Sequence, residues 1–218
     1  MSKTARRGGP RRIIILLVVV LIMSGAYAAW GFYTINKMQQ ESAVSLADLP
    51  WNGFFLDPPH EAPAIELIDQ YYNEFSLADH RGDLVVVFFG YTNCPDVCPA
   101  TLVYYTQVKR ELGPLAENVK FVFVSVDPEY DTPEHLERYV SRFDSTFYGL
   151  TGTPEQIAEI AREYGVYYEK VEAETSPVGY WVEHTAFTYV IDQDGNLRLV
   201  LPFGLEPPQI AADLRNLL

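Results

Sequence analysis

LVVVFFGYTNCPDVCP, residues 84–99, joins the most apolar strand-like run outside the N-terminus to the only two cysteines of the 218-residue chain. The run Leu84–Phe89 does not alternate between apolar and polar side chains, which is typical of a strand buried on both faces. Pro99 suits the first turn of a helix, where a missing N–H costs nothing. The thiols of Cys94 and Cys98 are therefore expected where a central strand ends and a helix begins.

The spacing of the two cysteines favours a chemical role. Residues i and i+4 share one face of a helix with Cα atoms roughly 6 Å apart, so Cys94 and Cys98 could bind one metal ion or close one disulfide. The positive end of a helix dipole also favours thiolate over thiol. The alternative is a pair of small buried apolar side chains. The neighbouring proline, aspartate and asparagine residues argue against that alternative.

The rest of the chain alternates strand-like and helix-like segments. Further strands are predicted over 73–77, 119–126, 147–150, 166–171, 186–191 and 197–201, and helices over 99–112, 133–143, 154–164 and 207–218. This order indicates an α/β fold with a mostly parallel central sheet, flanking helices and an antiparallel edge. A cysteine pair at the first strand-to-helix junction of such a pattern predicts a thioredoxin-like fold.

The N-terminal region has a different composition. Residues 1–12 are basic, and residues 13–33 carry no charge, a length sufficient for a transmembrane helix. Because the basic residues come first, the N-terminus is expected in the cytoplasm and the domain on the periplasmic side of a bacterial inner membrane. Ala26-Tyr27-Ala28 offers the alternative of a cleaved signal peptide. The anchor is preferred because the apolar run continues past that sequence.

Composition also separates a linker from a folded domain. Residues 34–63 are rich in proline and small polar residues and are predicted to be a linker. Residues 64–218 are predicted to be the thioredoxin-like domain. Residues 41–218 hold 10 basic and 29 acidic side chains, a net charge of −19, which disfavours nucleic acid and anionic lipid as partners of the domain. Such a domain suits a cationic or metal-bearing partner.

A third ligand would complete a metal site with the two thiolates. Two thiolates are a soft donor set that favours Cu(I), or zinc if further ligands join. Of the four histidines His60, His80, His135 and His184, only His184 comes just before a predicted strand, 186–191, that a thioredoxin-like fold brings close to the cysteine loop. Two thiolates and one imidazole suit Cu(I), and they also support Cu(II).

Four stretches of the chain resemble, in order, the motifs of the SCO/SenC family, the copper-binding assembly factors of cytochrome c oxidase. They are Gly90–Pro99, Val124–Pro133, Gly149–Tyr168 and Glu183–Thr185 with the following Asp194-Gly195 turn. The resemblance covers about residues 73–218 and implies that Cys94, Cys98 and His184 bind one copper ion. It also implies that Asp127 lies beside the ligands, and that the partner is the copper-site subunit of the oxidase.

Two functions remain open from the sequence. A membrane-anchored copper chaperone, which is not an enzyme, would pass Cu(I) or Cu(II) to the oxidase subunit by ligand exchange, with other copper carriers as further partners. A membrane-anchored thiol–disulfide oxidoreductase would instead reduce the cysteines of the copper-site apoprotein through Cys94 and Cys98, with thioredoxin-like reductants as partners. The Cys-x₃-Cys spacing and His184 favour the chaperone. A peroxidase is a weaker third alternative, because no separate peroxidatic motif is found.

Overall fold

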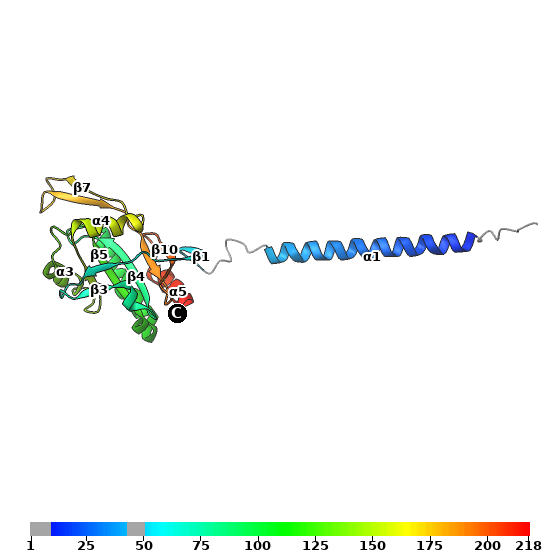
Figure 1. The fold of residues 1–218 in the computed structure, drawn as a ribbon, viewed down its shortest axis with the longest axis horizontal. Helices are drawn as coiled ribbons and strands as arrows, with labels where there is room; N and C mark the ends of the chain where they lie inside the picture. The colour runs from blue at the N-terminus through cyan, green and yellow to red at the C-terminus, as the bar shows by residue number, and fades with distance from the viewer. Residues whose placement is uncertain (1–9, 43–50) are drawn as a thin grey trace, which may run out of the picture. The chain divides into compact units, whose positions relative to one another are not determined.

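The computed structural model describes residues 10–42 and 51–218, which fall into two units. The described element of the N-terminal unit is the helix α1 (Pro10–Ser42) (Figure 1). The predicted membrane span 13–33 lies within α1. In the described part of the chain, no helix has both the length and the apolar character that crossing a membrane requires. The predicted basic N-terminus, 1–12, lies mostly outside the described residues.

The described part of the compact C-terminal unit begins at residue 51, within the predicted linker. Within the predicted linker, residues 54–61 form the strand β1 (Phe54–Glu61), which pairs antiparallel with β10 (Asn196–Leu201) at the edge of the main sheet. The prediction was wrong here because Pro58 and Pro59 suggested an unpaired segment. An edge strand tolerates proline, since one side of it donates no hydrogen bonds to a neighbour.

The main sheet has six strands in the order β1-β10-β9-β4-β5-β6. Its parallel part consists of β4 (Leu84–Gly90), β5 (Val119–Ser125) and, at one edge, β6 (Tyr148–Leu150). The antiparallel edge begins with β9 (Thr188–Ile191), which pairs with β4. All residues of β4 are buried, as the unalternating apolar run predicts. The predicted mixed sheet is confirmed.

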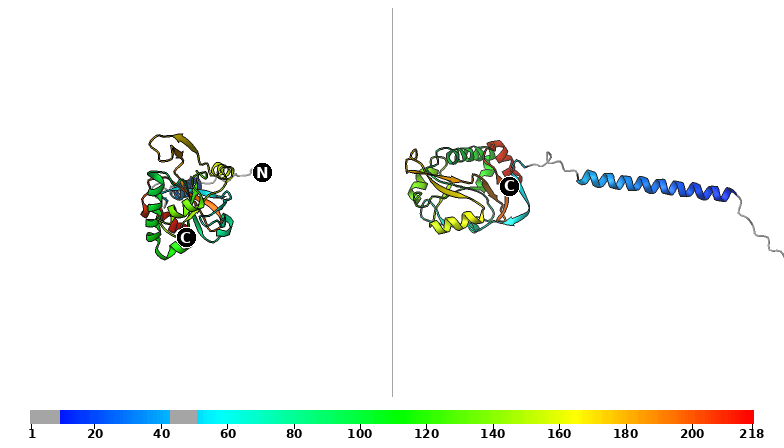
Figure 2. Two further views of the ribbon diagram at one scale, coloured as in Figure 1. Left: turned by 90° about the vertical axis from the view of Figure 1, so that its left-hand side faces the viewer. Right: turned by 90° about the horizontal axis from the view of Figure 1, so that it is seen from above.

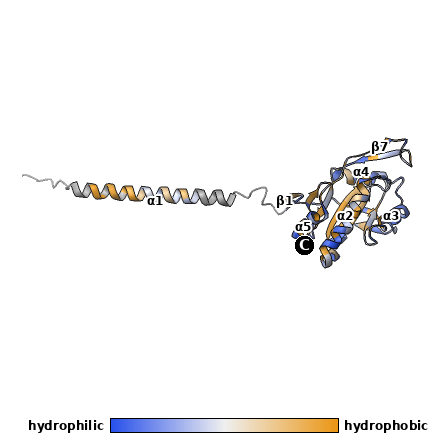
Figure 3. Cartoon of the chain, turned by 180° about the vertical axis from the view of Figure 1, so that it is seen from behind, coloured by the Kyte–Doolittle hydropathy of each residue, from blue (hydrophilic) through white to orange (hydrophobic). Residues whose placement is uncertain are grey.

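Helices cover both faces of this sheet. They are α2 (Val97–Leu112), α3 (Pro133–Val140), α4 (Pro154–Glu163) and α5 (Pro207–Leu217). Two short 3₁₀ segments lie between other elements, η2 (Leu77–His80) between β3 and β4 and η3 (Gly113–Asn118) between α2 and β5. Tyr105 of α2 packs on Phe121 of β5, and α5 packs against α2. On the opposite face, Tyr164 after α4 contacts Phe89 of β4. Figure 3 shows the apolar residues gathered in this interior.

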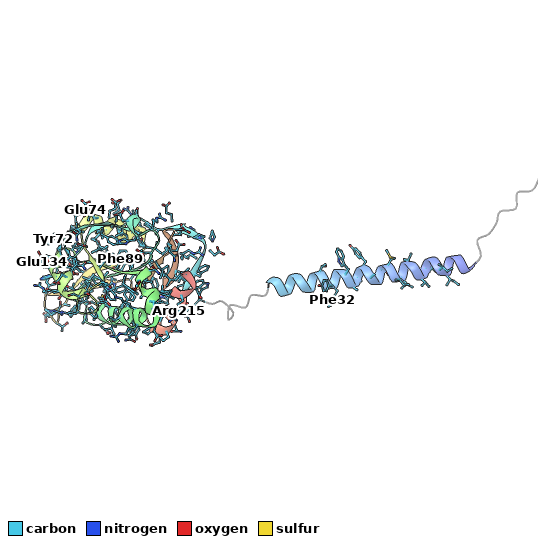
Figure 4. The ribbon with its side chains drawn as sticks, turned by 90° about the horizontal axis from the view of Figure 1, so that it is seen from below. Phe32, Tyr72, Glu74, Phe89, Glu134 and Arg215 are labelled. Carbon is cyan, nitrogen blue, oxygen red and sulfur yellow. The ribbon has the colours of Figure 1, made fainter. Side chains whose placement is uncertain are left out.

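Two small hairpins complete the unit. The first consists of β2 (Glu66–Ile68) and β3 (Glu74–Ser76). The hydroxyl of Tyr72, in the turn between these strands, donates a 2.5 Å hydrogen bond to Glu134 at the start of α3, and Figure 4 labels both side chains.

The second hairpin consists of β7 (Tyr168–Glu172) and β8 (Tyr180–His184), and it forms a sheet of its own. Figure 1 and the left view of Figure 2 show it as an arm that projects from the body of the unit. A strand over 166–171 was predicted, whereas β8 was not. The hairpin matters for function because β8 ends at His184.

Candidate metal centre

The cysteine loop connects β4 to α2. The helix begins at Val97, two residues earlier than predicted, so that Cys98 lies in its first turn and Cys94 lies in the loop before it. The side chain of the N-cap residue Asp96 makes no capping hydrogen bond. Instead, the backbone N–H of Cys98 points at Sγ of Cys94, 3.4 Å away. The Cys94 sulfur therefore takes one of the free donors of the helix N-terminus, which stabilises a thiolate.

Cys98 sits directly against the end of β4. Its side chain is fully buried, whereas Cys94 is partly exposed. A Cβ atom added at Gly90 would lie 2.8 Å from Sγ of Cys98 and 2.8 Å from the ring of Phe123. Real Cβ contacts are not that short, so a glycine is needed at the end of the strand to make room for the sulfur.

His184 reaches the cysteines from the hairpin. Its Nε2 atom lies 3.4 Å from Sγ of Cys98, and its Nδ1 atom lies 3.1 Å from the carbonyl oxygen of Thr185. A proton on Nδ1 satisfies that carbonyl and leaves the Nε2 lone pair free to bind a metal. The donor atoms of Cys94, Cys98 and His184 all lie within 4.8 Å of one another. The structure thus brings together the three residues proposed as ligands.

Aromatic side chains hold the imidazole on two sides. The rings of Phe88 and Tyr91 contact His184 edge-on, with centroid distances of 6.0 and 5.8 Å. The other three histidines make different contacts. His80 stacks on Phe75, Nδ1 of His135 lies 2.7 Å from a backbone carbonyl, and His60 is exposed on β1. None of these three belongs to the Cys94–Cys98–His184 group.

The two thiols differ in acidity. The hydrogen bond with Cys98 lowers the pKa of Cys94 to about 4, with further help from His184 and from the backbone N–H groups of Cys98 and Asp96. Burial raises the pKa of Cys98 well above its usual value, and the neighbouring Cys94 raises it further. At neutral pH the pair therefore holds one thiolate, on Cys94, and one thiol. Binding a metal through both sulfurs would release the Cys98 proton.

Asp127, expected beside the ligands, contacts the hairpin whose strand β8 ends at His184. Its side chain is fully buried just after β5. One carboxylate oxygen, Oδ2, accepts a 2.7 Å hydrogen bond from the hydroxyl of Tyr180 in β8. The other, Oδ1, forms a 2.7 Å ion pair with Lys170 in β7. Asp127 therefore acts on the histidine-bearing arm.

Asp131, which the sequence analysis missed, binds the cysteine loop. Its buried carboxylate accepts hydrogen bonds from the backbone N–H of Thr92 at 3.0 Å, from the Thr92 hydroxyl at 2.5 Å and from the Ser125 hydroxyl at 2.6 Å. Thr92 precedes Cys94 by two residues. A second aspartate in the turn that follows a buried strand was the signal available in the sequence. Burial raises the pKa of Asp131.

Known proteins are similar to this chain in sequence and in fold. The family model described as SCO1/SenC matches residues 56–218. A SCO2-like protein of Rickettsia conorii is 34% identical over 151 residues, which cover 69% of this chain and 74% of the relative. The copper-bound structure of ScoI from Bradyrhizobium japonicum is 37% identical, with a TM-score of 0.66, and the match covers 72% of this chain and 99% of that one.

A more distant structure supports the fold alone. BsSco, described as a member of the Sco family of cytochrome c oxidase assembly proteins, is 23% identical with a TM-score of 0.58, and the match covers 75% of this chain and 96% of that one. These similarities support the mixed α/β, thioredoxin-like fold expected from the sequence. Because the family model matches residues 56–218, which is well over half of the sequence, the chain belongs to the SCO1/SenC family.

Proposed function

We propose that this protein is a copper chaperone that carries one copper ion on Cys94, Cys98 and His184 and delivers it to the copper-site subunit of cytochrome c oxidase. The observation that carries the proposal is the convergence of two sulfur atoms and one imidazole nitrogen within 4.8 Å. Two soft thiolates and one imidazole suit Cu(I), and thiolate with imidazole also supports Cu(II). The copper-bound structure of a 37% identical relative supports the choice of metal.

The three ligands differ in how they would take up and release the ion. Cys94 is partly exposed and already a thiolate, so it makes the first bond to incoming copper. Cys98 then loses its proton to the solvent and binds from the buried side, and His184 completes the set. In delivery, the ligands of the receiving protein replace Cys94 and His184 first, because Cys98 is the least accessible of the three. This exchange needs no enzymatic turnover.

A thiol–disulfide oxidoreductase is the second candidate. It is favoured by the lowered pKa of Cys94, which makes this sulfur a nucleophile at neutral pH with Cys98 available to resolve a mixed disulfide. The partner would then be the cysteines of the copper-site apoprotein, with a thioredoxin-like reductant to regenerate the thiols. In that reaction His184 would only help to lower the pKa of Cys94, which the hydrogen bond with Cys98 lowers more strongly. Copper transport accounts for all three residues, and it is therefore the function we favour.

We further propose that the N-terminal segment anchors the protein in a bacterial inner membrane, with the domain on the periplasmic side. The support comes from the sequence, in which residues 13–33 are uncharged and follow a basic segment. Protease treatment of spheroplasts tests this location. Digestion of the domain in intact spheroplasts is expected, whereas a domain that is cut only after lysis would contradict the proposed orientation.

Copper binding by the full-length protein in detergent tests the chaperone function. Reduced protein is titrated with Cu(I) under anaerobic conditions in competition with a chromogenic chelator. One tightly bound ion per chain is expected, with a clear loss of affinity in His184→Ala and in either Cys→Ser variant. The control is His135→Ala, because His135 makes a backbone contact outside the three-residue group. A protein that binds no copper but readily forms a reversible disulfide would support the oxidoreductase.

A further inference from the structure

We propose that Asp127, Lys170 and Tyr180 form a latch that holds the β7–β8 arm against the body of the domain and thereby positions His184 over the two cysteines. The inference rests on the proposed copper-binding function. It assigns Lys170 and Tyr180 as positioning residues, which act on copper through His184. The latch also gives Asp127 a definite role, to anchor the arm.

The arm needs such an attachment because its own strands do not secure it. β7 and β8 pair only with each other, and a two-stranded hairpin by itself is marginally stable in water. Most of β7 is exposed, and in β8 only Val182 is fully buried. Figure 3 shows this arm as largely hydrophilic. Its position therefore depends on a few specific contacts.

The geometry of β8 connects the latch to the ligand. Tyr180 and His184 are the two ends of this strand, and with Val182 they alternate along one face of it. Tyr180 and His184 are separated by about 13 Å along the strand, because each residue of a strand adds about 3.3 Å. Lys170 lies opposite Val182 in the register of the hairpin. Fixing Tyr180 and Lys170 therefore sets the direction from which β8 presents the imidazole.

The contacts of the latch are close, and one member is charged and buried. Asp127 is 0% exposed at its side chain, and Nζ of Lys170 lies 2.7 Å from its Oδ1. The hydroxyl of Tyr180 donates to Oδ2 at 2.7 Å, and the Lys170 ammonium also lies 4.7 Å from the centre of the Tyr180 ring. Glu129 holds the exposed side of the same ammonium at 2.7 Å.

The Lys170 ammonium is the positive charge that compensates the buried carboxylate. Burial by itself lowers the pKa of Lys170, but its contacts with Asp127 and Glu129 outweigh burial and raise the pKa overall, so Lys170 stays charged at neutral pH. A buried carboxylate that loses its cation must regain water or take up a proton. Lifting the arm admits water to Asp127, and it also moves His184 away from Cys98.

The latch is continuous with the network that holds the cysteine loop. The Ser125 hydroxyl accepts a 3.0 Å hydrogen bond from the backbone N–H of Asp127 and donates to Asp131 at 2.6 Å. Asp131 in turn binds Thr92 of the cysteine loop. One turn after β5 thus fixes both the histidine arm and the cysteine loop, which determines the distance between the two kinds of ligand.

A double-mutant cycle tests the latch in the full-length protein. Lys170→Met removes the ammonium and keeps much of the aliphatic length. We expect Lys170→Met to weaken Cu(I) binding by about 10- to 100-fold, the loss usual when a partner that orients a metal ligand is removed. In a His184→Ala background the same substitution should change the affinity little, because the residue it positions is absent. An equal loss in both backgrounds would overturn the proposal.

Three further variants separate positioning from general damage. Lys109→Met is the matched control, because Lys109 forms an ion pair of the same 2.7 Å length with Asp144 and lies outside the arm; copper affinity should not change. Lys170→Met combined with Asp127→Asn removes both charges and keeps an acceptor for Tyr180. This double variant should recover most of the lost affinity, and failure to recover it would contradict the charge argument. The milder Tyr180→Phe should weaken binding less than Lys170→Met.

Amide hydrogen exchange of the copper-free protein provides a readout that does not depend on copper. Lys170→Met should speed exchange within 168–184 and leave β4 and β5 unchanged, whereas Lys109→Met should not affect 168–184. Unchanged exchange in the arm of Lys170→Met would overturn the latch even if copper binding by that variant were weakened. If the wild-type protein bound no copper, the proposed function would fail, and the exchange result would still decide whether the latch exists.

Discussion

Nε2 of His184 lies 3.4 Å from Sγ of Cys98, although 86 positions separate the two residues along the chain. Two buried aspartates on the turn after β5 hold the two segments that bring these atoms together. Asp131 holds the loop that carries Cys94, and Asp127 holds the arm that carries His184. The ligands thus come from three segments: Cys94 from the cysteine loop, Cys98 from the first turn of α2 and His184 from the end of β8. The turn after β5 binds both the loop and the arm.

Removing the Asp131 carboxylate should loosen the cysteine loop. Asp131→Ala leaves the Thr92 N–H and two hydroxyl groups without their acceptor. Since an unsatisfied buried group costs about 1–3 kcal/mol, we expect the free energy of unfolding in urea to fall by about 3 kcal/mol. Copper affinity should fall as well, because the loop no longer holds Cys94 in place.

A buried aspartate elsewhere in the domain supplies the control for this variant. Asp213 on α5 accepts hydrogen bonds from the backbone N–H groups of Asn52 and Gly53 and from the Asn52 side chain, before β1. Asp213→Ala should lower stability by a similar amount and leave copper affinity unchanged. If both variants weakened copper binding equally, the special role of Asp131 at the cysteine loop would be refuted.

The two cysteines should react with an alkylating agent in different pH ranges. Because the pKa of Cys94 is lowered to about 4, its thiolate is present throughout the range above pH 5, and its alkylation rate should be nearly constant from pH 5 to pH 8. Cys98, whose pKa is raised, should stay unmodified in that range. Mass spectrometry of peptides after iodoacetamide treatment measures both rates. A Cys94 rate that rises tenfold per pH unit up to pH 8 would exclude a lowered pKa.

Gly90→Ala should disturb the metal centre because the added methyl group has no room, without removing any ligand. The new methyl group would meet Sγ of Cys98 and the ring of Phe123, both at 2.8 Å. Overpacking of a core typically costs about 1–3 kcal/mol, and here the strain falls on a ligand. We expect a lower midpoint of thermal unfolding together with weaker copper binding. A variant as stable as the wild type would show that the sulfur has room that the structure does not indicate.

Disulfide formation should not depend on the histidine. His184→Ala removes the imidazole but leaves Cys94 and Cys98 in the loop and helix that hold them. Mild oxidation should therefore close one disulfide in the variant as readily as in the wild type, measured by the loss of free thiols. Cys94→Ser or Cys98→Ser should abolish it. If His184→Ala slowed the reaction strongly, the histidine would have a redox role that the chaperone account does not include.

The sequence predicted the parts of the fold that local patterns specify. The buried run of β4 and the helices predicted to start at Pro133 and Pro154 are local features, and the structure contains them. β1 was missed because Pro58 and Pro59 resemble a linker, whereas pairing with β10 makes it an edge strand. β8 was missed because it depends on contacts with β7 and with Asp127, which no local pattern reveals.

The sequence pointed to the three residues that the structure brings together and to one of the two supporting aspartates, Asp127. Cys94 and Cys98 could be chosen because they lie where a buried strand ends and a helix begins. His184 could be chosen because it comes just before a predicted strand. Asp131 could not be assigned, because it acts on Thr92, 39 positions earlier in the chain. The helical spacing argument for the two cysteines was also incomplete. Only Cys98 is in the helix. Cys94 lies in the loop before it, and its Sγ accepts a hydrogen bond from the backbone N–H of Cys98 at the helix N-terminus.

The most direct test of the central claim is the Cu(I) stoichiometry and affinity of the reduced full-length protein, compared with those of His184→Ala. The account predicts one copper ion per wild-type chain and a clear loss of affinity in the variant, because Nε2 of His184 is one of the three converging donors. Equal affinity in the two proteins would remove the histidine from the site, and the absence of copper binding in the wild type would contradict the chaperone function itself.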